Sequence, residues 1–170
     1  MEKILFFSGN KEKIKEVRRL FEKINFEVVS LNNFDSIAEP NENGKSFSEN
    51  AKIKSIHGFQ KMKIPCFADD SGICIEALNY KPNILSKRFI NKFKSRKECL
   101  NFIIDKVSLT KKKRAYFKSS ICYTLNTNYH IVFEGTVHGT ISRKILGKNG
   151  FGYDPIFIPN GYSKTFAEIT

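Results

Sequence analysis

The apolar and polar positions along residues 1–31 predict a strand, a glycine turn, a helix and a second strand. The apolar run at residues 3–8 is typical of a buried strand, and Ser8-Gly9-Asn10 at its end is turn chemistry. A short strand is expected at 26–31. The helix between them is indicated by apolar residues that recur at helical spacing, with charged residues on the other face: Ile14, Val17, Leu20, Phe21 and Ile24.

The middle of the chain predicts a loop, a capped helix and a pair of strands. Residues 32–45 are rich in Asn, Glu, Pro and Gly and indicate a loop, and Ser46-Phe47-Ser48-Glu49 is a capping-box pattern that opens a helix to about residue 62. We then expect a buried strand at 64–68, a sharp turn at Asp69-Asp70-Ser71-Gly72 and a returning strand at 73–78.

The second half of the chain predicts a helix and a long hairpin. Ser95-Arg96-Lys97-Glu98 is a second capping box, and the helix after it has the apolar face Leu100, Ile103, Ile104 and Val107. From 114 to 125 the residues alternate, with one face formed by Ala115, Phe117, Ile121, Tyr123 and Leu125 and the other by Arg114, Lys118, Ser120 and Thr124. A turn at 126–128 and renewed alternation to 141 indicate an antiparallel hairpin.

Together these elements predict an α/β fold, a mixed sheet with helices packed against it. The 170 residues contain no internal repeat, linker or low-complexity break, so 1–170 is expected to be one continuous domain. No apolar run approaches the roughly 20 residues that a membrane span needs, and the apolar N-terminal stretch is too short for a signal-peptide core. We therefore expect no membrane partner.

The formal net charge of +12 raises the question of a polyanionic partner. One interpretation is a nucleic-acid-binding protein. The other is a bias in composition toward Lys, Asn and Ile, which leaves a basic surface with modest attraction for any polyanion. The charges are spread along the chain, and the densest run, at 111–114, lies at an expected strand entrance. This distribution favours the second interpretation, with no specific nucleic-acid partner.

The cysteines and histidines argue against a structural disulfide or a zinc site. Cys66, Cys74, Cys99 and Cys122 show no CxxC spacing and each lies among apolar residues. The three histidines are scattered without ligand spacing. Buried free thiols are typical of a reducing compartment, so we expect a cytoplasmic location.

Two segments suggest phosphate and metal chemistry. The loop at residues 8–13 lies between a strand and a helix, where free backbone amides and the helix dipole favour an anion, although a Gly-Asn turn is common in proteins that bind none. Asp69-Asp70-Ser71-Gly72 places two carboxylates side by side, and a divalent cation would relieve their repulsion. A plain surface hairpin turn is the alternative for this segment.

Two further groups of residues are weaker candidates. In Gly150-Phe151-Gly152-Tyr153-Asp154-Pro155, the glycines allow a close approach to a ligand and Phe151 could stack on a base, but the segment could also be a simple loop. Asn50 and Lys54 are one helical turn apart and so share a face, and Glu42 lies in the acidic loop before them. A solvated surface is the alternative for these three residues.

Taken in order, these segments resemble one enzyme family, the inosine/xanthosine triphosphate pyrophosphatases. The matching stretches begin at Ser8, Ser46, Ala68, Ser86 and Gly150, and the last extends through residues 164–168. The resemblance implies a long, curved mixed sheet whose helices form two lobes around a central cleft, and a homodimer. It also implies hydrolysis of ITP, dITP or XTP to a monophosphate and pyrophosphate with Mg²⁺ as cofactor.

The resemblance also implies roles for individual residues. Asp70 is the implied catalytic base, and the implied metal ligands are Glu42 and Asp70, supported by Asp69. Pyrophosphate would leave after water attacks the α-phosphorus, without a covalent intermediate. The implied substrate-binding residues include the loop that holds the triphosphate, Lys54, and the segment that holds the base: Ser8, Gly9, Asn10, Lys11, Glu12, Lys13, Lys54, Ser71, Phe151, Gly152, Tyr153 and Asp154.

The chain departs from the family pattern at three places, one of them Ser8, where the family usually has Thr. Around 79–87 the family has a glycine-rich segment, and here Tyr80 and Asn83 replace glycines. Asn tolerates a left-handed backbone, whereas Tyr adopts it less readily, so this loop is expected to differ. The family also continues with a segment carrying a Lys and a Ser-His-Arg motif that contacts the base. The sequence here ends at Thr170, so we expect weaker base selectivity.

Two other functions compete with this interpretation. The related pyrophosphatases of the septum-formation-inhibitor type act on pyrimidine or modified nucleotides, but Asp69-Asp70-Ser71-Gly72 and the block at 151–154 favour the purine family. A basic nucleic-acid-binding module would bind polynucleotide without metal-dependent turnover, and it leaves the paired aspartates unexplained.

Overall fold

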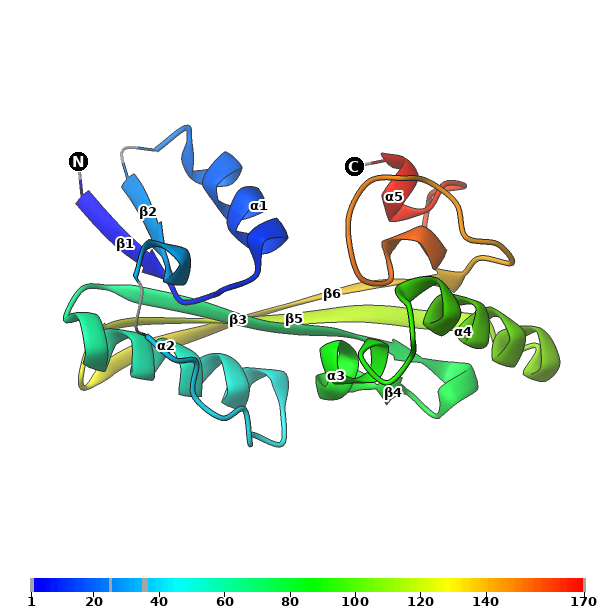
Figure 1. Ribbon diagram of the computed structural model, residues 1–170, viewed down its shortest axis with the longest axis horizontal. Coiled ribbons are helices and arrows are strands. Elements are labelled where there is room, and N and C mark those ends of the chain that lie inside the picture. Colours follow the sequence, from blue (N-terminus) through cyan, green and yellow to red (C-terminus); the bar gives the residue numbers. More distant parts are fainter. Residues whose placement is uncertain (1, 25, 35–36, 170) are drawn as a thin grey trace. The chain divides into compact units, whose positions relative to one another are not determined.

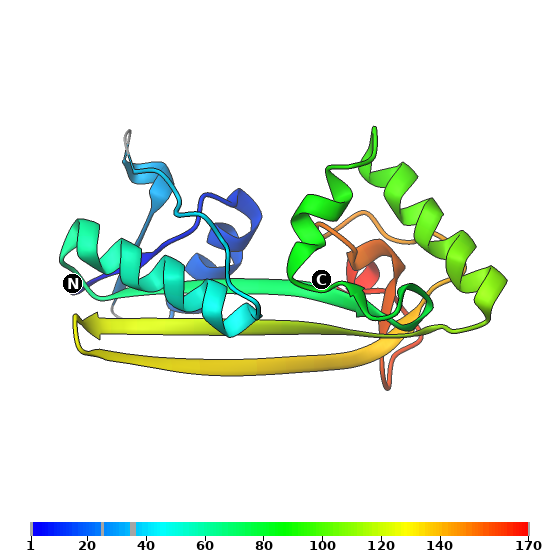
Figure 2. The same cartoon turned by 90° about the horizontal axis from the view of Figure 1, so that it is seen from below.

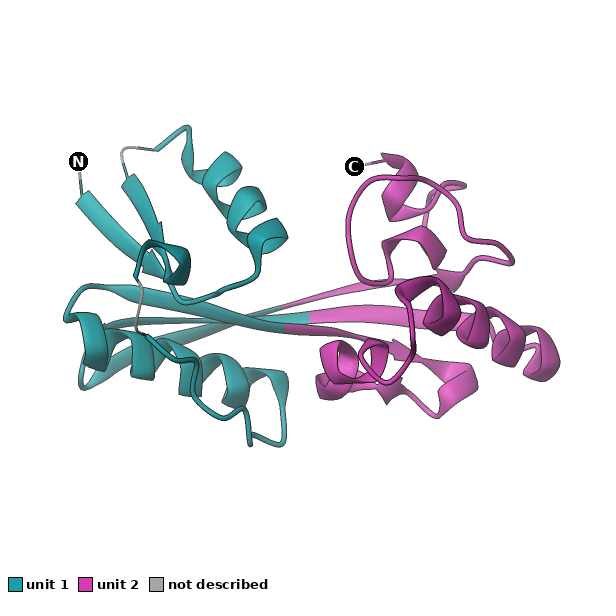
Figure 3. Cartoon of the chain, in the orientation of Figure 1, with its two compact units in different colours: residues 1–70, 119–134 teal, residues 71–118, 135–170 magenta. Residues whose placement is uncertain are grey.

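The computed structural model describes residues 2–24, 26–34 and 37–169 (Figure 1). The chain divides into two compact units, each formed by two segments (Figure 3). The first unit consists of Met1–Asp70 and Ser119–Glu134, and the second of Ser71–Lys118 and Gly135–Thr170. Each unit is described by itself below.

A seven-stranded mixed sheet has the strand order β2-β1-β3-β5-β6-β7, with β4 paired to β3. Strands β1 (Glu2–Phe6) and β2 (Phe26–Ser30) are parallel, and β1 is also parallel to β3 (Cys66–Ile75). Strand β4 (Lys81–Pro82) is antiparallel to β3, and β6 (Tyr129–Ile141) is antiparallel to β7 (Phe157–Pro159). With β5 (Arg114–Asn126), these strands confirm the predicted α/β class.

In the first unit, helices cover both faces of the sheet. Helix α1 (Lys11–Phe21) and helix α2 (Phe47–Met62) lie on opposite faces of the sheet (Figure 2). Helix α1 packs with Ile4, Phe6 and Phe67, and α2 packs with Leu5, Phe7 and Cys66. Successive residues of β1 point to opposite faces, so a strand covered on both sides needs the continuous apolar run seen in the sequence. A short 3₁₀ helix, η1 (Leu31–Asn33), follows β2.

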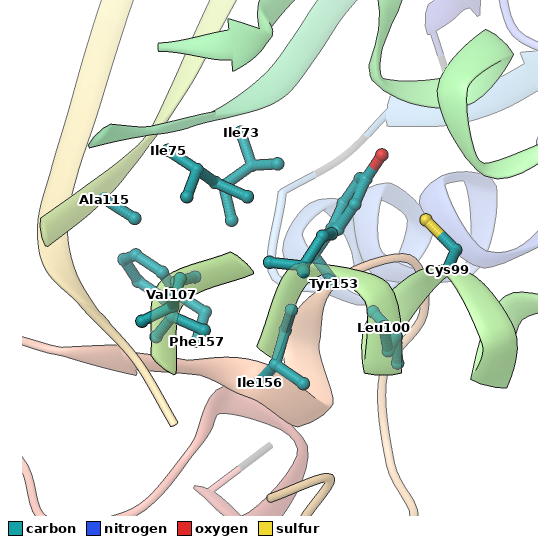
Figure 4. Close-up of a cluster of buried hydrophobic side chains, with 11 residues drawn as sticks. Ile73, Ile75, Cys99, Leu100, Val107, Ala115, Tyr153, Ile156 and Phe157 are labelled. Carbon is teal, nitrogen blue, oxygen red and sulfur yellow. The ribbon is translucent and has the colours of Figure 1, made fainter. Parts of the chain in front are cut away.

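The second unit has its own core, formed where α4 (Arg96–Thr110) packs on the end of β3 (Figure 4). Leu100 and Ile103 of the helix meet Ile73, Ile75 and Phe157, and all five are at most 2% exposed. The remaining short elements of this unit are η2 (Glu76–Leu78), η3 (Asn83–Leu85), α3 (Ser86–Ile90), η4 (Asp154–Ile156) and α5 (Phe166–Ile169). No described helix is both long and apolar enough to cross a bilayer.

The predicted helix starts are confirmed by their caps. The hydroxyl of Ser46 accepts the amide of Glu49 at 3.2 Å, and that of Ser95 accepts the amide of Glu98 at 3.1 Å. Each glutamate then accepts an amide one residue before the cap, rather than that of the cap itself. Helix α1 ends at Phe21, sooner than the spacing indicates, and the last predicted core position, Ile24, is 51% exposed.

The turn predicted at Asp69-Asp70-Ser71-Gly72 is wrong, because these residues lie inside the ten-residue strand β3. Near its start this strand pairs with β1 at Cys66, and at its end it pairs with β4 at Cys74 and Ile75. Pairing to neighbours at both ends holds the backbone extended, and this tertiary context overrides the turn preference of Asp, Ser and Gly. The strand predicted to continue to 78 instead ends at Ile75, where η2 begins.

The hairpin is confirmed, and both faces of β5 contribute to the cores. From the apolar face, Ala115 is buried in the second unit and Tyr123 packs against a core cluster of the first. In the first unit residues of the polar face of β5 are buried too, with Ser120 and Thr124 at most 1% exposed, whereas Ile121 of the apolar face is 40% exposed. Thr124 is covered by α2, because its hydroxyl lies 2.6 Å from the hydroxyl of Ser55.

The loop that lacks the expected glycines keeps a left-handed backbone. Asn79, Tyr80 and Asn83 have φ angles of 52°, 60° and 56°. The amide of Tyr80 donates to the carbonyl of Ile75 at 2.9 Å, and that of Asn79 to Glu76 at 3.0 Å. These hydrogen bonds hold Tyr80 in a conformation that its side chain disfavours.

Candidate active site

The loop between β1 and α1 is organised around the side chain of Asn10. This residue is the N-cap of α1, and its Oδ1 accepts the amides of Glu12 at 3.0 Å and Lys13 at 3.4 Å. The Ser8 hydroxyl accepts the amide of Asn10 at 3.2 Å, and Ser8 is buried. Two of the amides that could receive a phosphate are therefore already capped, while Lys11 and Glu12 lie exposed on the first helical turn.

A carboxylate occupies part of the predicted phosphate loop. Oε1 of Glu39, from the loop before α2, accepts the amide of Gly9 at 3.0 Å. An added Cβ at Gly9 would lie 3.3 Å from the same oxygen. The contact shows that the Gly9 amide points outward to a position that an anion can occupy.

Two lysine–carboxylate pairs lie beside this loop, all in the first unit. Nζ of Lys13 is 2.5 Å from Oδ2 of Asp69, and Nζ of Lys54 is 2.8 Å from Oε1 of Glu42. The four side chains are only 10–28% exposed. Partial burial strengthens these ion pairs relative to those on an open surface.

Asn50 connects Asp70 to the loop before α2. Its Nδ2 donates to Oδ2 of Asp70 at 2.9 Å, and its Oδ1 accepts the amide of Gly44 at 2.9 Å. Asn50 is 2% exposed and Asp70 is 7% exposed. The predicted shared face of Asn50 and Lys54 is confirmed, because both side chains reach carboxylates of this cluster.

The electrostatics of this cluster are set by burial and by the two lysines. Burial raises the pKa of Asp70, and the charge of Glu42 adds to this, while the hydrogen bond from Asn50 and the charges of Lys54 and Lys13 oppose it. Burial alone would lower the pKa of Lys54, but the hydrogen bond and charge of Glu42, with the charges of Asp69 and Asp70, raise it. Lys54 is therefore a buried cation surrounded by carboxylates.

The predicted metal ligands lie in this cluster without converging on one point. Among residues 2–24, 26–34 and 37–169, no three or more His, Cys, Asp or Glu side chains are grouped so that they could hold a metal ion. Glu42 and Asp69 are paired to lysines. The donor set suits Mg²⁺, which prefers oxygen ligands and takes one or two carboxylates together with substrate phosphates.

The second unit contains the segment predicted to hold the base. Gly150 and Gly152 have φ angles of 68° and 55°, which a side chain rarely adopts. Oδ2 of Asp154 accepts the amide of Phe151 at 2.7 Å and closes this turn. Burial raises the pKa of Asp154, while the Phe151 amide and the charge of Arg96 lower it. Asp154 therefore shapes the loop that carries Phe151.

Tyr153 is held inside the second unit. Its ring is 4% exposed, and its hydroxyl donates to the carbonyl of Ser86 at 2.7 Å. The hydroxyl of Ser86 in turn accepts the amide of Ile73 at 3.0 Å, so Tyr153 and β3 are joined through one residue. Ser71 is half-buried in the same strand. The substrate contacts of Tyr153 and Ser71 stay predictions.

Several residues of the site were missed by the sequence analysis. Glu39 had no distinguishing pattern in a polar loop. Arg96 was assigned only to a capping box, yet its Nε donates to the carbonyl of Gly152 at 2.6 Å. Only its position three residues before a buried helix face could have suggested that it points inward, and that signal is weak. Ser86 was part of a matched stretch without a role of its own.

Comparison with known proteins gives a consistent family. The sequence model of the Ham1 family matches residues 4–170. A dITP/XTP pyrophosphatase of Flavobacterium psychrophilum is 32% identical over 167 residues, covering 98% of this chain and 87% of the relative.

Solved structures of the same family are also similar. A HAM1 protein from Coxiella burnetii has a TM-score of 0.87 at 32% identity, covering 100% of this chain and 88% of that one. The nucleoside-triphosphatase / dITP/XTP pyrophosphatase from Mycobacterium abscessus has a TM-score of 0.79 at 36% identity, with coverage of 99% and 89%.

Proposed function

Because this chain belongs to the Ham1 family, which matches residues 4–170, we propose that it hydrolyses deaminated purine nucleoside triphosphates to a monophosphate and pyrophosphate. The substrates that we propose are ITP, dITP and XTP. The names of the relatives support this substrate class. The observation that carries the proposal is the half-buried cluster of Lys13, Lys54, Glu42, Asp69 and Asp70 beside the loop at Ser8–Lys13.

In the proposed reaction the lysines bind phosphate oxygens. Lys13 and Lys54 are held in place by Asp69 and Glu42, and this pre-organisation reduces the cost of ordering two long side chains when substrate binds. The Gly9 amide becomes a phosphate donor once Glu39 is displaced from it. Charge stabilisation at a fixed geometry is the main source of catalysis in phosphoryl chemistry.

Mg²⁺ is the proposed cofactor, with Glu42 and Asp70 as its protein ligands and Asp69 in support. The chemistry that a bound Mg²⁺ supplies is neutralisation of the triphosphate and polarisation of the phosphorus. The cluster holds three carboxylates and two ammonium groups, so it has a net charge of −1 when all are ionised. This negative charge favours a divalent cation over a bare triphosphate.

Asp70 is the proposed general base. Its carboxylate takes a proton from a water molecule, the water oxygen bonds to the α-phosphorus, and the bond to the bridging oxygen breaks so that pyrophosphate leaves. Asn50 fixes the carboxylate by donating to Oδ2, which leaves Oδ1 for the water. Burial raises the pKa of Asp70 and so increases its basicity.

The segment at residues 150–154 is proposed to bind the base. Phe151 supplies a ring for stacking, and Asp154 orders the backbone around it. Ser71, Gly152 and Tyr153 complete the proposed contacts.

We also propose a homodimer in a reducing cytosol. The hairpin end in the first unit exposes large apolar side chains that a second copy would cover: Ile121, Leu125, Tyr129, Ile131 and Phe133. Light scattering after gel filtration tests this, with Phe133→Asp expected to yield a monomer. The four cysteines are free and buried, which supports the proposed compartment.

The test of the activity is a pyrophosphate-release assay with ITP, XTP, dITP, dUTP and the four standard triphosphates, with and without Mg²⁺. Turnover of ITP, dITP and XTP that requires Mg²⁺ is expected. Preferred turnover of dUTP or another pyrimidine would favour the septum-formation-inhibitor type. Chromatography of the products should show monophosphate, and a diphosphate with orthophosphate would contradict the assignment.

A further inference from the structure

Arg96 holds the base-binding segment from a neighbouring helix. It is the first residue of α4, and its Nε donates to the carbonyl of Gly152 at 2.6 Å. Gly152 lies between Phe151 and Tyr153, where a backbone with a φ of 55° turns the chain. A charged donor on a carbonyl makes a stronger hydrogen bond than a neutral one. Arg96 therefore fixes the middle of this turn.

The same guanidinium acts on Asp154. The positive charge of Arg96 lowers the pKa of this carboxyl, against the effect of burial. Asp154 uses Oδ2 to accept the amide of Phe151 at 2.7 Å. Arg96 thus acts on the turn twice, through its hydrogen bond to the Gly152 carbonyl and through its charge beside Asp154.

Two features of Arg96 are costly for a purely structural residue. Its Nη2 is buried and has no hydrogen-bond partner among the described residues. An unsatisfied buried donor on a charged group costs free energy. In addition, Arg96 lies at the positive end of the α4 dipole, where a cation is disfavoured. An apolar side chain of similar length would avoid both costs.

A residue that leaves a buried donor unsatisfied and opposes the helix dipole is expected at a functional site rather than at a structural one. We propose that Arg96 is a positioning residue for recognition of the purine base, because it fixes the Gly150–Asp154 turn that carries Phe151. This inference rests on the proposed function. Arg96 acts through Gly152 and Asp154, so its loss should weaken binding of the nucleoside part and leave binding of the phosphates unchanged.

The test compares Arg96→Met with Lys97→Met in the full chain. Lys97 is the exposed neighbour of Arg96 on the same helical turn, so its substitution removes one positive charge without touching the turn. Arg96→Met is expected to raise the KM for ITP and the Kd for inosine monophosphate about tenfold, the loss of one charge-assisted hydrogen bond. The kcat should change less than twofold, and the inhibition constant for pyrophosphate should stay the same.

Thermal unfolding separates this role from a structural one. Arg96→Met should unfold within a few degrees of the wild type, because the loss of the hydrogen bond to the Gly152 carbonyl is offset by the removal of a buried unsatisfied donor. Arg96→Lys, which keeps the charge, should recover part of the lost affinity for inosine monophosphate. Lys97→Met should resemble the wild type in every measurement.

The outcomes distinguish the two proposals. If the wild-type protein hydrolyses ITP and Arg96→Met has an unchanged KM, or loses affinity for pyrophosphate to the same extent, the role of Arg96 is refuted while the proposed function stands. If Arg96→Met unfolds at a lower temperature and its weaker binding follows the unfolded fraction, Arg96 is structural. If the wild-type protein turns over no purine triphosphate, the proposed function fails and the inference fails with it.

Discussion

Two asparagine side chains organise the charged part of the site. Asn50 bridges Asp70 and the amide of Gly44, and Asn10 caps α1 through the amides of Glu12 and Lys13. An amide side chain can accept and donate at once, so it holds a carboxylate without changing the net charge. This chemistry keeps Asp70 in one orientation while it carries a raised pKa.

Asp70→Asn is expected to lower kcat by about 10² to 10⁴-fold, the usual contribution of a general base. Because burial disfavours the charge of Asp70, the neutral amide should fit at this site without loss of stability. Steady-state kinetics and a thermal melt measure the two effects. Asp105→Asn, on the exposed face of α4, is the control and should be fully active. Near-normal turnover of Asp70→Asn would remove this residue from the mechanism.

Glu39→Gln is expected to lower the KM for ITP about threefold, with little change in kcat. The carboxylate of Glu39 accepts the Gly9 amide and would repel an incoming triphosphate, whereas an amide oxygen competes less well for the same donor. Initial rates at low ionic strength are the measurement, since salt screens the repulsion. Glu22→Gln, at the exposed C-cap of α1, removes the same charge and should leave KM unchanged. An equal decrease of the KM in both variants would mean that the net charge of the protein, and not the position of Glu39, sets the KM.

At the scale of elements, β3 brings the two aspartates to the site by staying extended. Successive side chains of a strand point to opposite faces, so Asp69 pairs with Lys13 of α1 and Asp70 accepts from Asn50 of α2. Gly72, further along β3, is close to Asn83 and Ser86. The left-handed backbone at Asn83 allows this approach, and the loop therefore packs against the strand.

Gly72→Ala is expected to destabilise the fold by about 1–3 kcal/mol, the usual cost of overpacking. The new Cβ would lie 2.4 Å from both the Asn83 carbonyl oxygen and the Ser86 hydroxyl, and the first of these is backbone that cannot easily move. Gly135→Ala is the matched control in strand β6, because nothing lies within 4 Å of its added Cβ. Urea denaturation measures the free energy of unfolding of the wild type and both variants, and Gly72→Ala should be the least stable. Equal stability of the two variants would show that the loop shifts without cost.

At the scale of the whole molecule, the net charge of +12 bears on its partners. In the first unit two cations predicted to bind phosphate are ion-paired to carboxylates, with Lys13 on Asp69 and Lys54 on Glu42. Scattered surface lysines add only a counterion-release contribution to binding. We therefore attribute the charge to the composition of the chain and not to a nucleic-acid site.

Polynucleotide binding is expected to be weak and to be lost between low and physiological salt. Fluorescence anisotropy with labelled single- and double-stranded oligonucleotides, at about 50 and 200 mM salt, gives the slope of affinity against salt. The same slope is expected for unrelated sequences, because phosphate contacts carry no sequence information. Tight binding that depends on sequence at physiological salt would instead support the nucleic-acid-binding module.

The sequence alone determined the features that depend on neighbouring residues. Helix starts at Ser46 and Ser95, the α/β class and the hairpin follow from caps and periodicity, which are local. The pairing of Asn50 and Lys54 on one face follows from helical geometry in the same way. The resemblance to the pyrophosphatases identified the residues around which the charged cluster forms.

Only the tertiary structure decided which residues those features meet. The strand conformation of Asp69-Asp70-Ser71-Gly72 depends on pairing with β1 and β4, and the burial of Thr124 depends on α2 above it. Glu39 at Gly9 and Arg96 at Gly152 are contacts over 30 and 56 residues of sequence. Contacts at such separation depend on how the chain packs, because a packed neighbour can outweigh the local preference of a turn or a polar face.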